Sequence, residues 1–326
     1  MRLRHAISTS AFLILVTACT WANTVEGSFD RTLNVSSGNV DLDVRTGAGN
    51  ITVRSGSGNT VSVHAKIQAH DNWLWNSGPS AEEKVKNLQA NPPIEQTGNL
   101  IRIGHVAGEN MRNVAISYEI VTPRDTRLHS TTGSGSQQIS DIGGSVRVGT
   151  GSGNLRLENI GGEVRANSGS GGIEVRNVKA YTYTDTGSGS IVATGIAGGF
   201  FGRTGSGEIR FEQTAPGSVQ AQAGSGSIRL KNVNGSLEAG TGSGDLEVQG
   251  EIAADWRLHT GSGSVRVELP RSARFDVNAD SGSGSVTIDH PVTVQGTMRR
   301  NHIEGAVNGG GVKLHINTGS GSIHVI

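Results

Sequence analysis

The chain has 326 residues, with 7 prolines and 49 glycines, and its glycine share is about twice the usual one. Glycine and proline together stay below the level typical of disordered chains, so we expect a folded protein. The 28 basic and 28 acidic side chains give a formal net charge of +0. A polyanion therefore has no electrostatic basis for binding, and we expect no nucleic-acid partner.

The first segment, residues 1–22, is typical of an export signal. Two arginines precede an apolar run over residues 11–16, which is too short to span a bilayer. Two processing sites remain open: Val16-Thr-Ala-Cys19 resembles a lipoprotein signal ending at residue 18, and Thr20-Trp-Ala22 suits ordinary signal peptidase. We expect an exported protein, located in the periplasm, anchored to the outer membrane or at the cell surface. Its membrane contact would be a lipid at Cys19, the only cysteine.

Residues 23–65 are expected to form the first strands, and residues 66–127 an insertion or cap. The first strands are marked by apolar pairs that alternate with polar residues: Leu42/Val44, Ile51/Val53 and Val61/Val63. In the insertion, the capping-box spacing of Ser80 and Glu83 predicts a short helix over 80–90, followed by strands. We expect this helix to cover an open end of the fold.

Residues 128–326 carry a repeat. A Gly-Ser-Gly phrase begins at Gly133, Gly151, Gly169, Gly187, Gly205, Gly224, Gly242, Gly261, Gly282 and Gly319. Most steps are 18 residues, and each unit holds two apolar strand patterns nine residues apart. Counting by nine from Leu128, with one-residue slips, gives mostly apolar positions as far as Val265. Later the repeat loosens, and residues 312–325 are expected to close the array.

This period predicts an all-β fold, namely a two-sheet parallel β-solenoid of about 18 residues per coil, with a small helix/strand insertion near the N-terminal end. A single unit buries too little apolar surface to offset the entropy lost on ordering, so only the stack is stable. We expect the corner glycines to supply positive φ angles for the tight reversals between strands.

Three features resemble a known family: the opening Val-Glu-Gly-Ser-Phe-Asp-Arg-Thr-Leu over 25–33, the phrase Val-Ala-Ile-Ser-Tyr-Glu-Ile-Val-Thr-Pro over 114–123, and the Gly-Ser-Gly ladder. The family consists of bacterial exported β-solenoid domains of unknown function and is labelled “putative adhesin”. The resemblance covers nearly the whole mature chain. It implies the solenoid fold and an adhesion-type role, and its motifs carry no catalytic residue.

Outward positions 18 residues apart should lie side by side on adjacent coils. One such set, Arg147, Arg165, Tyr183 and Phe201, places two aromatic rings beside arginines, and we call it the Arg–aromatic row. We expect ligand contacts at Arg165, Tyr183 and Phe201, and at Trp73 and Trp75 of the insertion. The alternative is local packing under a loop or edge.

A further outward set should form only solvated ion pairs. It contains Arg156 and Glu174, whose exposed pairing is worth under about 1 kcal/mol.

The pattern gives little support for chemistry. An acid follows only two of the ten Gly-Ser-Gly phrases, so the corners cannot form a ladder of calcium sites, and the histidines lack metal-ligand spacing. We expect no metal, no cofactor and no enzymatic activity. The sequence favours a non-catalytic cell-envelope structural or adhesion-type binding module, whose partner is an envelope glycan or a surface or periplasmic protein. The alternative is a carbohydrate-active enzyme, a polysaccharide lyase or hydrolase, with a shallow site on a sheet face.

Overall fold

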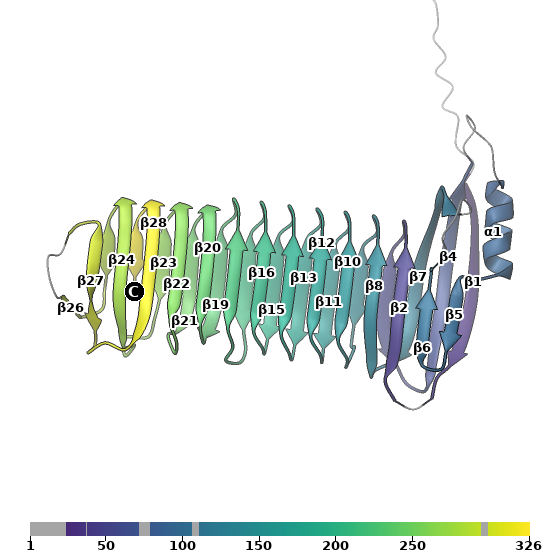
Figure 1. Cartoon of the computed structure of the whole chain (residues 1–326), viewed down its shortest axis with the longest axis horizontal. Helices are drawn as coiled ribbons and strands as arrows, with labels where there is room; N and C mark the ends of the chain where they lie inside the picture. The colour runs from purple at the N-terminus through teal and green to yellow at the C-terminus, as the bar shows by residue number, and fades with distance from the viewer. Residues whose placement is uncertain (1–23, 37, 72–78, 106–110, 295–298) are drawn as a thin grey trace, which may run out of the picture.

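The structure is a computed structural model that describes residues 24–36, 38–71, 79–105, 111–294 and 299–326. Within these residues the chain forms 29 strands and one helix, and two sheets lie face to face along one long axis (Figure 1). The strands of successive coils pair in parallel over most of the length. The predicted two-sheet parallel β-solenoid is therefore confirmed.

Sheet A has 14 strands. In spatial order they are β1 (Thr24–Asn34), β4 (Thr60–His70), β7 (Val114–Pro123), β3 (Ile51–Gly56), β9 (Gln137–Ser140), β11 (Leu155–Ile160), β13 (Ile173–Val178), β15 (Ile191–Ile196), β17 (Ile209–Gln213), β19 (Ile228–Asn234), β21 (Leu246–Glu251), β23 (Val265–Glu268), β29 (Ile323–Val325) and β25 (Val286–Ile288).

Sheet B has 15 strands. In spatial order they are β26 (Val292–Val294), β27 (His302–Val307), β24 (Phe275–Ser283), β28 (Val312–Ser320), β22 (Trp256–Ser262), β20 (Leu237–Ser243), β18 (Val219–Ala223), β16 (Phe200–Thr204), β14 (Thr182–Thr186), β12 (Val164–Ser168), β10 (Val146–Thr150), β8 (Thr126–Thr132), β2 (Val40–Thr46), β6 (Leu100–Ile103) and β5 (Ile94–Thr97).

The register of the coils follows the 18-residue period. Leu155 pairs with Ile173 in sheet A, and Val146 pairs with Val164 in sheet B. Alternate side chains point between the sheets, as strand geometry requires. The interior positions of the nine-residue series are all buried: Leu128, Gln137, Val146, Leu155, Val164, Ile173, Thr182, Ile191, Phe200, Ile209, Val219, Ile228, Leu237, Leu246, Trp256 and Val265.

Large rings in this thin core fill space that small neighbours leave. The Phe200 ring stacks on Phe211 across the sheets, with centroids 4.4 Å apart. The Phe200 ring also occupies the space beside Gly202, where a Cβ would lie 2.5 Å from the Phe200 Cζ. Trp256 is fully buried, and its indole N–H donates to Gly235 O at 2.8 Å. Small and large residues therefore alternate so that the two sheets keep one spacing.

The corner glycines play a different part from the predicted one. Most glycines of the Gly-Ser-Gly phrases have no positive φ, so the predicted reason for them is wrong. They are needed because consecutive corners are in contact: a Cβ on Gly153 would lie 1.9 Å from Gly135 O, and one on Gly171 would lie 1.8 Å from Gly153 O. A Cβ never sits that close to a carbonyl oxygen. Glycine therefore permits the close stacking of backbone on backbone.

A buried hydroxyl precedes every Gly-Ser-Gly corner of residues 128–326 except the one at Gly224, and it bonds that corner to the neighbouring coil. Thr150 Oγ1 donates to Gly135 O at 2.9 Å and accepts the Gly153 N–H at 3.0 Å. Equivalent bonds to a corner carbonyl of the adjacent coil, 2.7–3.0 Å long, come from Thr132, Ser168, Thr186, Thr204, Thr241, Thr260, Ser281 and Thr318. This hydroxyl ladder satisfies backbone groups that the reversal leaves without strand partners.

At the C-terminal ends of several sheet A strands, an asparagine or aspartate adopts a left-handed conformation. Asp141, Asn159 and Asn177 have φ angles of 62°, 58° and 55°. Their side chains stack in register, because the amide of each asparagine donates to the residue one coil back at 2.9 and 3.0 Å. Asparagine and aspartate tolerate this conformation better than other residues with a Cβ.

The N-terminal end carries the predicted helix. α1 (Ala81–Ala90) begins at the N-cap Ser80, which forms the expected capping box with Glu83. The helix lies against β1 and β4 at the end of sheet A (Figure 1), and its apolar face is buried there. Gln89 donates to Ser28 O at 3.0 Å. The helix therefore covers β1, the edge strand of sheet A.

The C-terminal end departs from the sequence prediction. Residues 312–325 do not close the array, because β28 lies between β22 and β24, and β29 lies between β23 and β25. The outermost coil is instead the earlier one, formed by β24 and β25. The chain then turns back, and β27 pairs antiparallel with β24 and covers its outer edge. The last coil of the chain, formed by β28 and β29, therefore lies between the coil of β22 and β23 and the coil of β24 and β25.

Candidate functional site

The outer face of sheet B carries the predicted ligand-binding residues that the structure describes. Arg165, Tyr183 and Phe201 lie on β12, β14 and β16 and pair directly in the parallel register. Arg147, on β10, precedes Arg165 in the same register. The structure thus assembles the whole Arg–aromatic row. Trp73, Trp75 and Cys19 lie outside the described residues.

The two rings of the row form a close stack. Their centroids are 4.7 Å apart and their planes differ by 2°. Such a pair contributes about 0.5–1.5 kcal/mol beyond its buried area, so part of its role is to hold neighbouring coils together. Both rings nevertheless remain partly exposed on the sheet face.

Polar neighbours fix the ends of this row. Arg165 Nε donates to Glu163 Oε1 at 2.8 Å, and this hydrogen bond raises the pKa of the arginine. The Tyr183 hydroxyl donates to Asp185 Oδ2 at 3.3 Å. Partial burial, followed by the charge of Asp185, raises the pKa of Tyr183.

A third aromatic residue belongs to the same surface. Tyr181 precedes β14 and is 42% exposed. Its ring occupies the space beside Gly199, where a Cβ would lie 2.8 Å from the Tyr181 Cδ2. Sequence reasoning missed this residue, although its spacing of two from Tyr183 placed it on the same face. We call Tyr181, Tyr183 and Phe201 the aromatic cluster.

Two shallow hollows lie on sheet B, toward either end of the solenoid from the aromatic cluster. The first, of about 440 Å³, is lined by residues of β2, β8, β10 and β12 that include Arg127, His129 and Arg147. The second, of about 680 Å³, is lined mainly by residues of β20, β22, β24 and β28, among them Arg257, His259 and His315. Sheet B therefore presents rings between two polar depressions.

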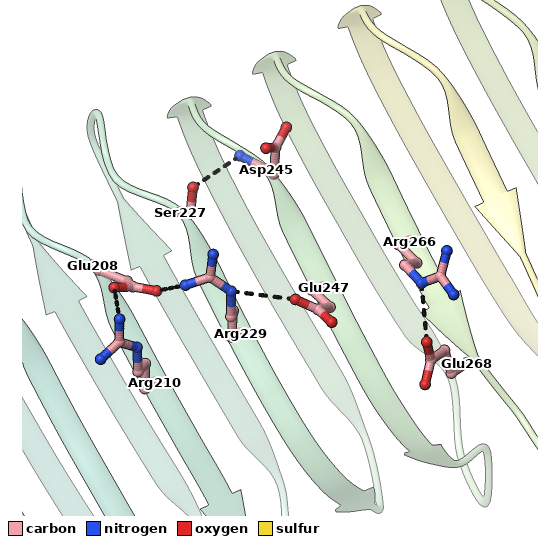
Figure 2. A network of polar contacts seen from close by, with 8 residues as sticks. All are labelled: Glu208, Arg210, Ser227, Arg229, Asp245, Glu247, Arg266 and Glu268. Atoms are coloured by element: carbon pink, nitrogen blue, oxygen red, sulfur yellow. Dashed lines mark hydrogen bonds and ion pairs between the residues drawn. The ribbon is translucent and has the colours of Figure 1, made fainter.

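Many of the charged side chains on the outer face of sheet A pair with one another (Figure 2). Glu208 accepts from both Arg210 and Arg229, and Arg229 also bonds Glu247 at 3.2 Å. The predicted pair Arg156–Glu174 is present at 3.6 Å. Exposed pairs of this kind each contribute under about 1 kcal/mol. Sheet A is thus a solvated, charge-balanced surface.

A larger hollow, of about 1310 Å³, lies along the corners near the C-terminal cap. Its carboxylates already have partners: Glu268 binds Arg266 at 2.9 Å, and Asp289 binds His324 at 3.1 Å. Among the described residues, no three His, Cys, Asp or Glu side chains come together in a way that could hold a metal ion. In the same part of the chain, no helix has the length and apolar character needed to cross a membrane.

These observations define a parallel two-sheet β-solenoid with one aromatic-bearing sheet face. Residues 162–326 match the family model described as Toastrack DUF4097, and the chain belongs to this family. No curated protein sequence matches the chain.

Three solved structures are similar to the chain over 92% of its length. A “putative adhesin” from Parabacteroides distasonis is 11% identical, with a TM-score of 0.44 and 97% of its own chain covered. A “putative cell adhesion protein” from Clostridium sporogenes is 12% identical, with a TM-score of 0.24 and 99% covered. A “putative adhesin” from Bacteroides fragilis is 12% identical, with a TM-score of 0.29 and 97% covered.

Proposed function

We propose that this protein is a non-catalytic cell-envelope module, structural or adhesion-type, that presents sheet B as a rigid binding surface. One observation carries the proposal: the aromatic cluster lies on the outer face of sheet B between two hollows, whereas the aromatic side chains of sheet A, Phe29, Tyr118 and Phe211, are all buried. Exposed aromatic side chains beside polar groups are typical of binding surfaces.

The solenoid suits this role mechanically. Each coil is tied to the next by a parallel ladder and by buried hydroxyls, so residues far apart in sequence keep fixed positions on one face. A surface of this kind loses little conformational entropy on binding. The proposed partner is an envelope glycan or a surface or periplasmic protein.

A binding screen tests the proposal. Purified protein is screened against glycan arrays and envelope fractions, and every hit is tested for turnover. The double variant Tyr183→Ser/Phe201→Ser should lose binding, and Val192→Ser/Arg210→Ser, which changes two outward residues on sheet A, should retain it. Turnover of a bound glycan would favour the lyase or hydrolase alternative, and equal binding by both variants would refute the sheet B surface.

The cellular location is part of the proposal. We infer export, to the periplasm or to the outer membrane or cell surface, from the signal-like segment, and the two processing routes predict different products. Metabolic labelling with a fatty acid, compared between wild type and Cys19→Ser, separates them. Labelling that disappears in the variant indicates a lipid anchor, and an unlabelled soluble wild-type protein indicates ordinary signal cleavage.

A further inference from the structure

The Arg–aromatic row runs along the axis of the solenoid. Its four members lie on consecutive strands of sheet B, and neighbouring strands are about 4.8 Å apart. A compact ligand meets only two of these positions. An extended polysaccharide advances by a comparable distance per sugar, so a linear glycan lying along the axis can meet each position in turn.

The net charge of +0 gives the whole chain no attraction for a polyanion, so an acidic ligand needs a local cation, and the first hollow supplies one. Its carboxylates are already bound: Asp41 by Arg127 at 2.9 Å, Asp43 by Arg45 at 3.2 Å, and Glu163 by Arg165. Arg147, which lines the same hollow, forms no ion pair with any residue that the structure describes. One cation is therefore left for a ligand, and an arginine fork matches a carboxylate in both geometry and charge.

The rest of the row fits sugar rings. The Tyr183 and Phe201 rings stack on each other and remain partly exposed, next to the exposed ring of Tyr181. Outward polar side chains on the flanking positions, among them Asn167 and Gln220, can bond to hydroxyl groups. Apolar rings with a few polar groups are the usual lining of carbohydrate-sized sites.

From this arrangement we propose that sheet B binds a linear acidic polysaccharide along the solenoid axis, with a uronate carboxylate on Arg147 and neighbouring sugars on the aromatic cluster. The inference rests on the proposed binding function and adds to it the class of ligand, its direction and the residue that selects its charge.

The test compares polygalacturonate with its fully methyl-esterified form, which has the same backbone without the charge. By calorimetry, the intact protein should bind polygalacturonate at least about tenfold more tightly than the ester or the galacturonate monomer, the effect expected of one charge-assisted contact and of polymer length. Arg147→Gln should remove the preference for the acid. Arg156→Gln, which deletes the same charge on sheet A, should leave it unchanged.

Each outcome decides the proposal. Equal binding of the acid and the ester, binding of the monomer as tight as that of the polymer, or an unaffected Arg147→Gln variant overturns it. The polysaccharide proposal also fails if the protein does not bind polygalacturonate but still binds an envelope fraction through Tyr183. In that case the proposed binding function still stands. If the protein binds neither an envelope fraction nor any glycan, the polysaccharide proposal and the proposed binding function are both refuted.

Discussion

At each Gly-Ser-Gly corner of residues 128–326, a glycine α-carbon of one turn lies against a backbone carbonyl of the neighbouring turn. The nearest approach leaves no room for a methyl group, as at Gly153 over Gly135. Gly149, in β10, differs from these corner glycines, because a Cβ there would meet only the Thr131 Cγ2 at 3.7 Å. Close contact, not turn conformation, therefore decides which glycines matter.

This difference predicts opposite outcomes for two alanine substitutions. Gly153→Ala should lower the free energy of unfolding by more than about 2 kcal/mol, because the coils must separate to admit the methyl group. Gly149→Ala should have little effect. Denaturant unfolding of the two variants checks the pair, and similar losses for both would contradict the contact explanation.

One position of the hydroxyl ladder, Ala223, has no hydroxyl group. Ala223 ends β18 where the other coils have Thr or Ser, so the bond that Thr204 makes to Gly189 O has no counterpart there. Ala223→Thr should stabilise the fold by about 1 kcal/mol by adding a buried hydrogen bond. The matched control is Ala223→Val, which has the same shape without the hydroxyl. If valine stabilises as much as threonine, packing rather than the hydrogen bond is responsible.

A buried tyrosine predicts how stability depends on pH. Tyr118 is 1% exposed, its hydroxyl has no hydrogen-bond partner among the described residues, and burial raises its pKa well above 10.0. Above pH 10 the unfolded tyrosine ionises while the folded one keeps its proton, so its contribution to stability is complete below that pH and is lost as pH rises further. Tyr118→Phe should show a shallower alkaline loss in urea unfolding series, and an unchanged slope would contradict this origin.

At the scale of elements, the repeat explains why so much of the fold could be predicted. Residues nine apart alternate between the sheets, and residues 18 apart stack, so the core from Leu128 to Val265 and the neighbours Tyr183 and Phe201 follow from spacing alone. The same regularity hides the order of the last coils. Val277 and Trp256 both offer Leu314 a compatible partner, so the pattern cannot say which coil lies outermost.

The inserted coil predicts a specific effect of truncation. Without residues 312–326, β24 and β25 lose the strands that join them to β22 and β23. Hydrogen exchange in β24 and β27 should become fast, while β10–β16 stay protected, because solenoid coils depend mainly on their neighbours. Continued protection of β24 would mean that it docks directly on β22, and would contradict the need for the inserted coil.

At the scale of the whole molecule, the outer faces of sheet A and sheet B expose different kinds of side chain. Sheet A pairs many of its charges and has its β1 edge covered by α1, while β27 and β26 extend sheet B beyond β24 at the other end (Figure 1). Sheet B keeps partly exposed rings on strands held at fixed spacing, and several of its described arginines, Arg147 among them, form no ion pair. We therefore expect a partner to bind sheet B and not sheet A.

Radical footprinting with mass spectrometry tests that assignment most directly, because it reports which side chains a bound partner covers. The protein is oxidised free and when bound to the envelope fraction that retains it. The account predicts reduced oxidation of Tyr181, Tyr183 and Phe201, with unchanged rates for outward residues of sheet A such as Val192. Protection of sheet A while the three rings oxidise as fast as before would contradict it.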